Sequence, residues 1–169
     1  PQREIDEHHI IERSDGSLWM LLRAPYGIAE SESRDGGRTW SKGKQAPIRH
    51  VNSRFCIRRL RSGNLMLVTH EPPDGKTRSN LIARLSTDDG RTWQGGLMLD
   101  ERPGVSYPDA TEEPGGVISV IYDYERSKAR QILMARFNEL NLLRGKPSRT
   151  TRLKIQVNEA VGSARSNIN

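Results

Sequence analysis

The chain has 169 residues, of which 34% are hydrophobic and 5% aromatic, and a formal net charge of +6. This length suits one domain of ordinary size. No apolar run approaches the roughly 20 residues that span a bilayer, and no secretory leader is visible, so we expect no membrane partner and a cytoplasmic location if the chain is complete. The scarce aromatic residues disfavour a thick two-layer core and favour small repeated sheets, for which 15 glycines and nine prolines supply the turns.

The positive charge is concentrated toward the C-terminal end. Residues 138–169 carry six basic and two acidic side chains, which leaves +4: Arg144, Lys146, Arg149, Arg152, Lys154 and Arg165 against Glu139 and Glu159. This stretch lacks interleaved aromatic residues and any glycine-rich or helix-turn-helix signature. We interpret it as a solvated surface and expect no nucleic-acid partner.

In chain order, short strands alternate with turns, and helical periodicity is almost absent. Strands are expected over residues 17–24 and 27–33, then 54–60, 64–70 and 80–86, then 105–110, 117–124 and 131–137. Further strands are expected near 43–48, 96–99 and 152–157, with a helix-like start over 138–146. The single cysteine, Cys56, falls in a predicted strand and is expected to be a small buried residue and not a catalytic thiol.

An eight-residue box is repeated between the third and fourth strands of the first two sets. Residues 33–40 read Ser-Arg-Asp-Gly-Gly-Arg-Thr-Trp, and residues 86–93, 53 positions later, read Ser-Thr-Asp-Asp-Gly-Arg-Thr-Trp. In each copy the aspartate can accept backbone hydrogen bonds, the glycine can take a positive φ, and the tryptophan can fold back over the turn. The third set has no box after residue 137.

Four short antiparallel strands in each repeat of about fifty residues describe a propeller blade. We therefore predict an all-β fold, a single propeller fragment of about three blades over residues 1–50, 51–103 and 104–160. Propellers have four to eight blades, so three cannot close a ring. Because open sheet edges invite pairing, we expect either a preceding half or a second copy of the chain, in a homodimer, to complete the propeller.

Four polar residues near strand ends are candidates for chemistry: Glu7, Arg23, Arg78 and Tyr107. Arg23 ends an apolar strand, an awkward place for a guanidinium unless it meets an anion. Tyr107 precedes Pro108, which favours extended backbone at the tyrosine. Each also has an ordinary interpretation: the arginines as surface salt-bridge partners, Tyr107 as a half-buried core aromatic and Glu7 as a loop carboxylate.

Together with the boxes, these residues resemble the sialidase (neuraminidase) superfamily of six-bladed propellers with Asp-box, or BNR, repeats. Residues 7–23 look like that family's glutamate-bearing strand, Asp-Gly turn and arginine-ended strand, and residues 77–81 like the stretch with a later arginine. Residues 105–109 and 121–125 look like its tyrosine segment and the strand after it. The resemblance covers nearly the whole chain, as the family's C-terminal half.

The resemblance implies a glycoside hydrolase acting on a terminal, acidic sugar of a glycan. Tyr107 would attack the anomeric carbon, Glu7 would take its proton, and Arg23 and Arg78 would clamp the substrate carboxylate, with His8 as a further sugar contact. A neutral phenol avoids the repulsion that a carboxylate nucleophile would meet there. No cofactor is implied, and no third ligand stands beside the two adjacent histidines to form a metal site.

The chain also departs from the family. Its first clamp arginine and its aspartate acid lie in the N-terminal half, which this chain lacks, and Pro108 after the tyrosine is not the commonest form. Two alternatives therefore stay open: a non-catalytic carbohydrate-binding propeller and an Asp-box propeller that docks proteins. Convergence of Glu7, Arg23, Arg78 and Tyr107 on one face would favour the enzyme, whereas their separation would favour protein docking.

Overall fold

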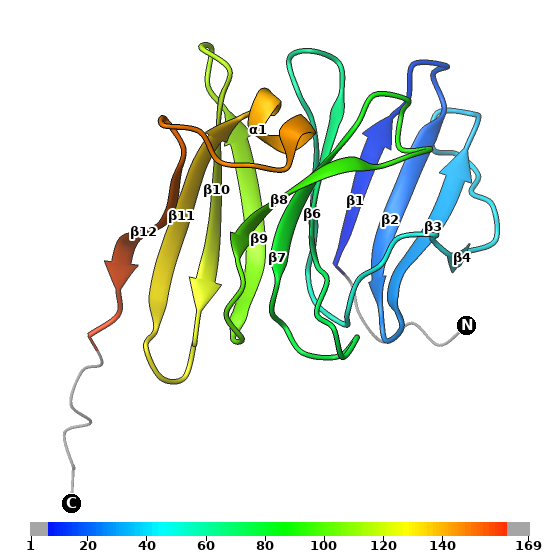
Figure 1. The fold of residues 1–169 in the computed structure, drawn as a ribbon. Coiled ribbons are helices and arrows are strands. Elements are labelled where there is room, and N and C mark those ends of the chain that lie inside the picture. Colours follow the sequence, from blue (N-terminus) through cyan, green and yellow to red (C-terminus); the bar gives the residue numbers. More distant parts are fainter. Residues whose placement is uncertain (1–6, 162–169) are drawn as a thin grey trace, which may run out of the picture.

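A computed structural model of the chain describes residues 7–161 as three four-stranded antiparallel sheets (Figure 1). Sheet A consists of β1 (His8–Glu12), β2 (Leu18–Ala24), β3 (Gly27–Ser33) and β4 (Lys44–Gln45). Sheet B consists of β5 (Cys56–Arg59), β6 (Leu65–His70), β7 (Leu81–Ser86) and β8 (Gln94–Asp100). Sheet C consists of β9 (Val105–Glu112), β10 (Val117–Tyr124), β11 (Gln131–Asn138) and β12 (Arg152–Glu159), with helix α1 (Glu139–Arg144) between the last two. Arg165 lies outside the described residues.

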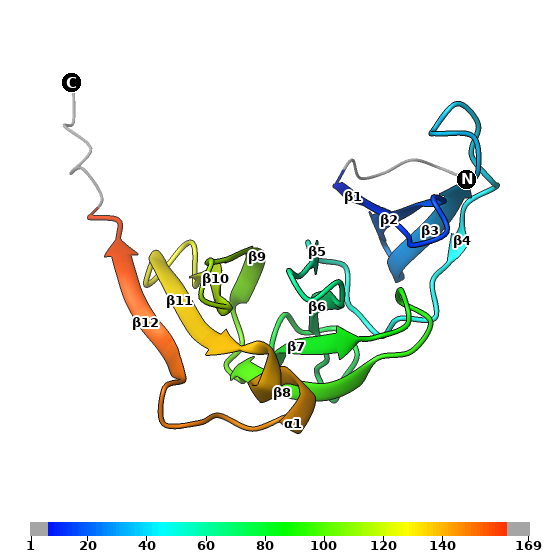
Figure 2. The ribbon, with the colours of Figure 1, turned by 90° about the horizontal axis from the view of Figure 1, so that it is seen from above.

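The sheets are arranged side by side around a common centre, with the first strands β1, β5 and β9 innermost (Figure 2). This is the blade arrangement of a propeller, so the predicted all-β fold with about three blades is confirmed. Over residues 7–161 no helix has the length and hydrophobicity that a membrane crossing needs.

Two separate cores hold the sheets together. One lies between sheets A and B and includes Trp19, Leu21 and Phe55, and the other lies between sheets B and C and includes Val68, Tyr122 and Leu142. Sheet B is covered on both sides, and every residue of β6 is buried. The outer faces of the two end sheets remain open, since Ile10 on β1 is 47% exposed and Ile132 on β11 is 38% exposed.

The two boxes form nearly identical turns. In the first, Ser33 donates to Asp35 at 2.8 Å, and the backbone N–H of Thr39 donates to the same carboxylate at 2.9 Å. The Asp88 box repeats both bonds at 2.8 Å. Hydrogen bonds from the threonine hydroxyl and backbone lower the pKa of each aspartate to about 2, so the predicted role of these carboxylates as turn acceptors is confirmed.

The second box also fastens sheet B to sheet A. Gly90, with a φ of +84°, lies against the buried ring of Trp19, so close that a β-carbon would come within 2.5 Å of its Cζ3. The neighbouring Asp89 accepts from the backbone N–H of Ser14 at 3.0 Å and pairs with Arg59 at 2.8 Å. The tryptophans differ as well. Trp40 donates to its own turn, as expected, whereas Trp93 packs against the core between sheets A and B.

Helix α1 takes the place of the missing third box. Asn138 caps its start by accepting from the backbone N–H of Asn141 at 3.1 Å, and Gly145 ends it in the left-handed conformation. The helix packs on β8 and buries Leu142. Gly95 makes this close approach possible, since a β-carbon there would lie 1.9 Å from the Leu142 carbonyl oxygen.

One predicted strand is much shorter than expected. The fourth strand of sheet A covers two residues, where the sequence suggested 43–48. The Ala46 N–H still donates to the Ile28 carbonyl at 3.0 Å, but Pro47 has no N–H with which to continue the ladder.

Candidate active site

Glu7, Arg23, Arg78 and Tyr107 lie at one end of the three sheets. Glu7 immediately precedes β1, Arg23 is near the end of the antiparallel β2, Arg78 precedes β7, and Tyr107 is the third residue of β9. The boxes follow β3 and β7 and therefore lie at the opposite end (Figure 1). The antiparallel order of the strands thus brings residues that are up to 100 positions apart in the sequence to the same end of the sheets.

Glu7 and Arg23 form a well-shielded ion pair. The Arg23 Nη1 donates to Glu7 Oε2 at 2.8 Å, and their side chains are only 11% and 28% exposed. Burial opposes ionisation of Glu7, but hydrogen bonds from Arg23 and from the Tyr107 hydroxyl outweigh it and lower the pKa of the carboxyl. Glu7 is therefore an ionised acceptor that pairs with Arg23 and lies near the Tyr107 hydroxyl.

Asn52, in the segment between sheets A and B, joins the two arginines. Its side-chain oxygen accepts from Arg23 Nε at 2.8 Å, and its backbone carbonyl accepts from Arg23 Nη2 at 3.3 Å and from Arg78 Nη2 at 3.1 Å. The two guanidinium groups, which we call the arginine pair, are thereby held beside one oxygen. The sequence analysis missed Asn52, because a single asparagine in an irregular segment carries no pattern.

Tyr107 sits in a β-bulge. Asp109 pairs with Ile121 and Ser106 with Asp123, so two residues of β9, Tyr107 and Pro108, oppose one residue of β10. Its φ is +54°, and the extended backbone expected before a proline is therefore wrong. A bulge re-aims a side chain and accommodates a proline that cannot donate to the ladder. Positive φ in a bulky residue is strained, and such strain clusters at functional sites.

Arg126 covers the tyrosine ring. The guanidinium carbon lies 3.8 Å from the centroid of Tyr107, and the Nε donates to Asp123. Asp123 in turn accepts from Ser106 Oγ at 2.5 Å. The sequence analysis also missed Arg126, which follows β10 in a hairpin turn; its only sequence signal is its place three residues after Asp123 in a segment already associated with the tyrosine.

The two adjacent histidines of β1 have different surroundings. His8 is exposed, whereas His9 packs against Phe55 with ring centroids 5.4 Å apart, and burial lowers its pKa. Behind the site a second histidine pair is buried. The His70 backbone N–H donates to His50 Nδ1 at 3.1 Å, and burial lowers the pKa of His50 to about 4 and that of His70 to about 3.

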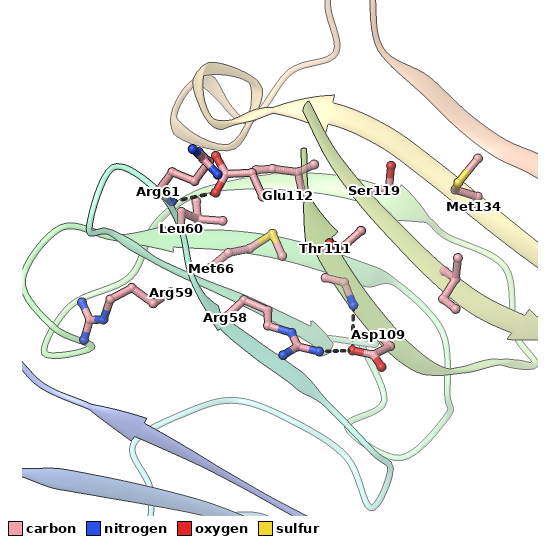
Figure 3. A pocket seen from close by; sticks show the side chains of 13 residues that line it. Arg58, Arg59, Leu60, Arg61, Met66, Asp109, Thr111, Glu112, Ser119 and Met134 are labelled. Atoms are coloured by element: carbon pink, nitrogen blue, oxygen red, sulfur yellow. Dashed lines mark hydrogen bonds and ion pairs between the residues drawn. The ribbon is translucent and has the colours of Figure 1, made fainter. Parts of the chain in front are cut away.

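A hollow of about 630 Å³ lies between sheets B and C, away from the four candidate residues (Figure 3). Arg58 pairs with Asp109 across it at 2.8 Å, and the Arg61 backbone N–H donates to Glu112 at 2.6 Å. Cys56 is fully buried nearby, and burial raises the pKa of its thiol to about 12, as suits the structural role predicted for it. No group of His, Cys, Asp and Glu side chains within residues 7–161 could hold a metal ion.

Residues 3–120 match the family of BNR repeat-like domains. The chain belongs to this family. No curated protein sequence matches it. The matched residues include both aspartate boxes described above, residues 33–40 and 86–93.

Solved structures extend the comparison to whole propellers. The BNR repeat-like chain superposes on an α-L-arabinanase from Penicillium chrysogenum complexed with arabinobiose with a TM-score of 0.61, at 17% identity, over 89% of this chain and 48% of that one. The α-L-arabinofuranosidase Arb93A of Fusarium graminearum in complex with an iminosugar inhibitor superposes with a TM-score of 0.56, at 17% identity, over 89% of this chain and 48% of that one. The Hadza microbial sialidase Hz136 superposes with a TM-score of 0.51, at 16% identity, over 88% of this chain and 34% of that one. The chain thus shares the propeller fold of these glycoside hydrolases. It spans about half the length of the arabinanase and the arabinofuranosidase and about a third of the length of the sialidase.

Chemically, the site offers an ionised carboxylate near a phenol, beside two guanidinium groups held by one asparagine. A carboxylate next to a hydroxyl nucleophile is the arrangement of base-assisted nucleophilic catalysis. Paired guanidinium groups bind carboxylates through forked, charge-assisted hydrogen bonds.

Proposed function

We propose that this BNR repeat-like chain forms half of an exo-acting glycoside hydrolase that cleaves a terminal acidic sugar from a glycan. Tyr107 is the nucleophile, Glu7 its base, and Arg23 and Arg78 bind the substrate carboxylate. The observation that carries the proposal is the convergence of these four residues, from three sheets, on one edge of the fold. His8 remains a predicted sugar contact.

In the proposed first step, the phenol oxygen of Tyr107 bonds to the anomeric carbon while its proton passes to Glu7 and the aglycone departs. A phenol is a much weaker acid than a carboxylic acid, so this proton transfer is uphill. The proton must therefore move as the new bond forms, and the developing phenolate needs further stabilisation. The acid that protonates the aglycone would come from a part of the propeller beyond this chain.

The arginine pair favours an acidic over a neutral sugar. Arg23 is largely shielded from water, and its charge is balanced by Glu7, so the charge of a substrate carboxylate would be balanced mainly by Arg78. An unbalanced anion in such a site would be costly. An arabinoside has no carboxylate and would make no use of the charge on Arg78.

The open outer faces of sheets A and C support a larger propeller. Ile10 and Ile132 lie on faces that a neighbouring blade would cover in a closed ring. We propose that either further blades of a longer chain or a second copy of this one covers them. A mass measurement in solution separates the two, because a monomer of this chain would contradict the second copy.

The test is hydrolysis of a fluorogenic sialoside, with a fluorogenic α-L-arabinofuranoside in parallel. We expect release from the sialoside alone, and loss of at least about 100-fold in kcat for Tyr107→Phe, which keeps the ring but removes the nucleophilic oxygen. Tyr26→Phe is the matched control, since Tyr26 is an exposed turn residue. Release from the arabinofuranoside alone would contradict the acidic substrate, and full activity of Tyr107→Phe would contradict the nucleophile. Sugar binding without turnover in either variant would favour the non-catalytic carbohydrate-binding alternative.

A further inference from the structure

None of the four residues discussed above stabilises the negative charge that develops on the Tyr107 oxygen in the proposed reaction. Glu7 is already engaged by Arg23, so it is a weak base for a phenol. A second group that favours negative charge on the Tyr107 oxygen would ease the transfer, because developing charge in an active site is stabilised best by preorganised positive groups.

Arg126 is placed to supply that charge. Its guanidinium carbon lies 3.8 Å from the centre of the Tyr107 ring, within the range in which a cation and an aromatic face attract each other. This attraction grows when the ring carries the negative charge of a phenolate, because a cation–anion interaction is added to it. The contact therefore favours the state in which Tyr107 is nucleophilic.

The guanidinium is fixed by a chain of hydrogen bonds that returns to the tyrosine's own strand. Arg126 Nε donates to Asp123, whose side chain is 11% exposed, and Ser106 Oγ donates to the other carboxylate oxygen at 2.5 Å. Ser106 and Asp123 are cross-strand partners, and Ser106 immediately precedes Tyr107. The same bulge that re-aims the phenol therefore aligns the groups that hold Arg126 over it.

We infer that Arg126 is a positioning residue of the proposed hydrolase, which holds Tyr107 in its reactive orientation and favours the phenolate as the sugar–oxygen bond forms. This inference rests on the proposed function. In the step it assists, the Tyr107 oxygen bonds to the anomeric carbon, the phenolic proton passes to Glu7, and the leaving group departs with the bonding electrons. Arg126 gains and loses no proton.

A sialic acid derivative with fluorine at the anomeric carbon and at the neighbouring carbon isolates this step. Fluoride leaves as an anion without needing a proton, and the second fluorine slows the later hydrolysis, so a covalent glycosyl-tyrosine accumulates. Intact-mass and peptide-mass measurements follow its formation on Tyr107 over time and over probe concentration. The time courses give a limiting rate and an apparent affinity for each variant.

Three variants decide the inference. Arg126→Gln should lower the limiting labelling rate by about 10- to 100-fold with little change in apparent affinity, and Arg126→Lys, which keeps the charge, should recover part of it. Lys128→Gln is the matched control, because Lys128 lies in the same hairpin turn with its side chain 81% exposed, and its substitution removes the same charge without touching the tyrosine. It should label within about twofold of the unmodified chain. A thermal melt of each variant checks that the fold is retained.

The outcomes separate the two proposals. Labelling of Arg126→Gln at the unmodified rate, an equal loss in Lys128→Gln, or a change in apparent affinity alone would overturn the role of Arg126 and leave the proposed hydrolase standing. Failure of the unmodified chain to label at Tyr107 would instead contradict the proposed nucleophile, and the inference with it.

Discussion

Because the box occurs twice, the same substitution in each copy can show how much the packing of the second box on sheet A contributes to stability. Gly37 and Gly90 occupy the same box position with φ values of +89° and +84°. A β-carbon at Gly37 would meet the flexible Leu18 Cδ1 at 3.4 Å, an ordinary contact, whereas one at Gly90 would meet the Trp19 ring at 2.5 Å. Alanine at either position introduces the same backbone strain, but only at Gly90 does it also press on the neighbouring sheet.

The expected magnitudes follow from these two terms. Left-handed backbone costs an alanine about 1 kcal/mol, so Gly37→Ala should lower the free energy of unfolding by about that amount. The Trp19 ring cannot retreat easily, because it is 2% exposed and its Nε1 donates to Glu30 at 3.0 Å. Overpacking of such a site adds about 1–3 kcal/mol, and Gly90→Ala should therefore cost about 2–4 kcal/mol.

Equilibrium denaturation in urea, followed by circular dichroism, measures both variants against the unmodified chain. The midpoint should fall further for Gly90→Ala, with an unchanged dependence on denaturant if the transition stays two-state. Equal losses, within about 0.5 kcal/mol, would refute the reasoning, because they would mean that the packing of Gly90 on Trp19 contributes nothing beyond the turn itself.

Three further predictions concern the surroundings of the site. Asn52→Ala should weaken binding of the fluorinated probe about 10-fold while the limiting labelling rate changes less, because Arg23 loses the side-chain acceptor of its Nε, whereas the backbone carbonyl that both arginines share is kept; an unchanged affinity would contradict this. With the pKa of His50 at about 4 and that of His70 at about 3, the unfolded chain binds protons below pH 6.5 that the folded chain does not. Unfolding free energy should therefore fall as the pH drops from about 6.5 toward 4, by about 2 kcal/mol per histidine at pH 5, and a flat profile from pH 7 to 5 would be evidence against buried neutral imidazoles. Cys56, fully buried with a thiol pKa of about 12, should react with a maleimide only after denaturation, and rapid labelling of the native chain would contradict its burial.

Local patterns in the sequence predicted most of the strands, because alternation and turn residues act over a few positions. The structure reproduces the predicted limits of β3 and β10, and the repeated box located the turns after β3 and β7. The box did not show that the second copy packs on Trp19, since the two copies share the glycine and only the three-dimensional neighbour differs.

The site shows where such patterns stop being informative. Glu7 and Tyr107 could be singled out by residue type and order, yet the bulge at Tyr107 depends on how β9 pairs with β10, which Pro108 alone does not specify. Asn52 and Arg126 lie in connecting segments, where their positions follow from the packing of the sheets. Their contributions could be found only when the three sheets were seen together.

Because the residues of the site come from different sheets, the proposed chemistry depends on the contacts that hold the sheets together at the opposite end of the fold. Glu7 and Arg23 belong to sheet A, Arg78 to sheet B, and Tyr107 to sheet C, so small rotations between sheets change the distances among them directly. Misplacement by about 1 Å costs a catalytic constellation about 100-fold. The second box packs on Trp19 between sheets A and B, and α1 docks over Gly95 between sheets B and C, so we expect these contacts to restrain both rotations. These contacts therefore serve the proposed reaction although they lie at the opposite end of the sheets, and a variant such as Gly90→Ala should slow labelling of Tyr107 even under conditions in which the chain remains fully folded.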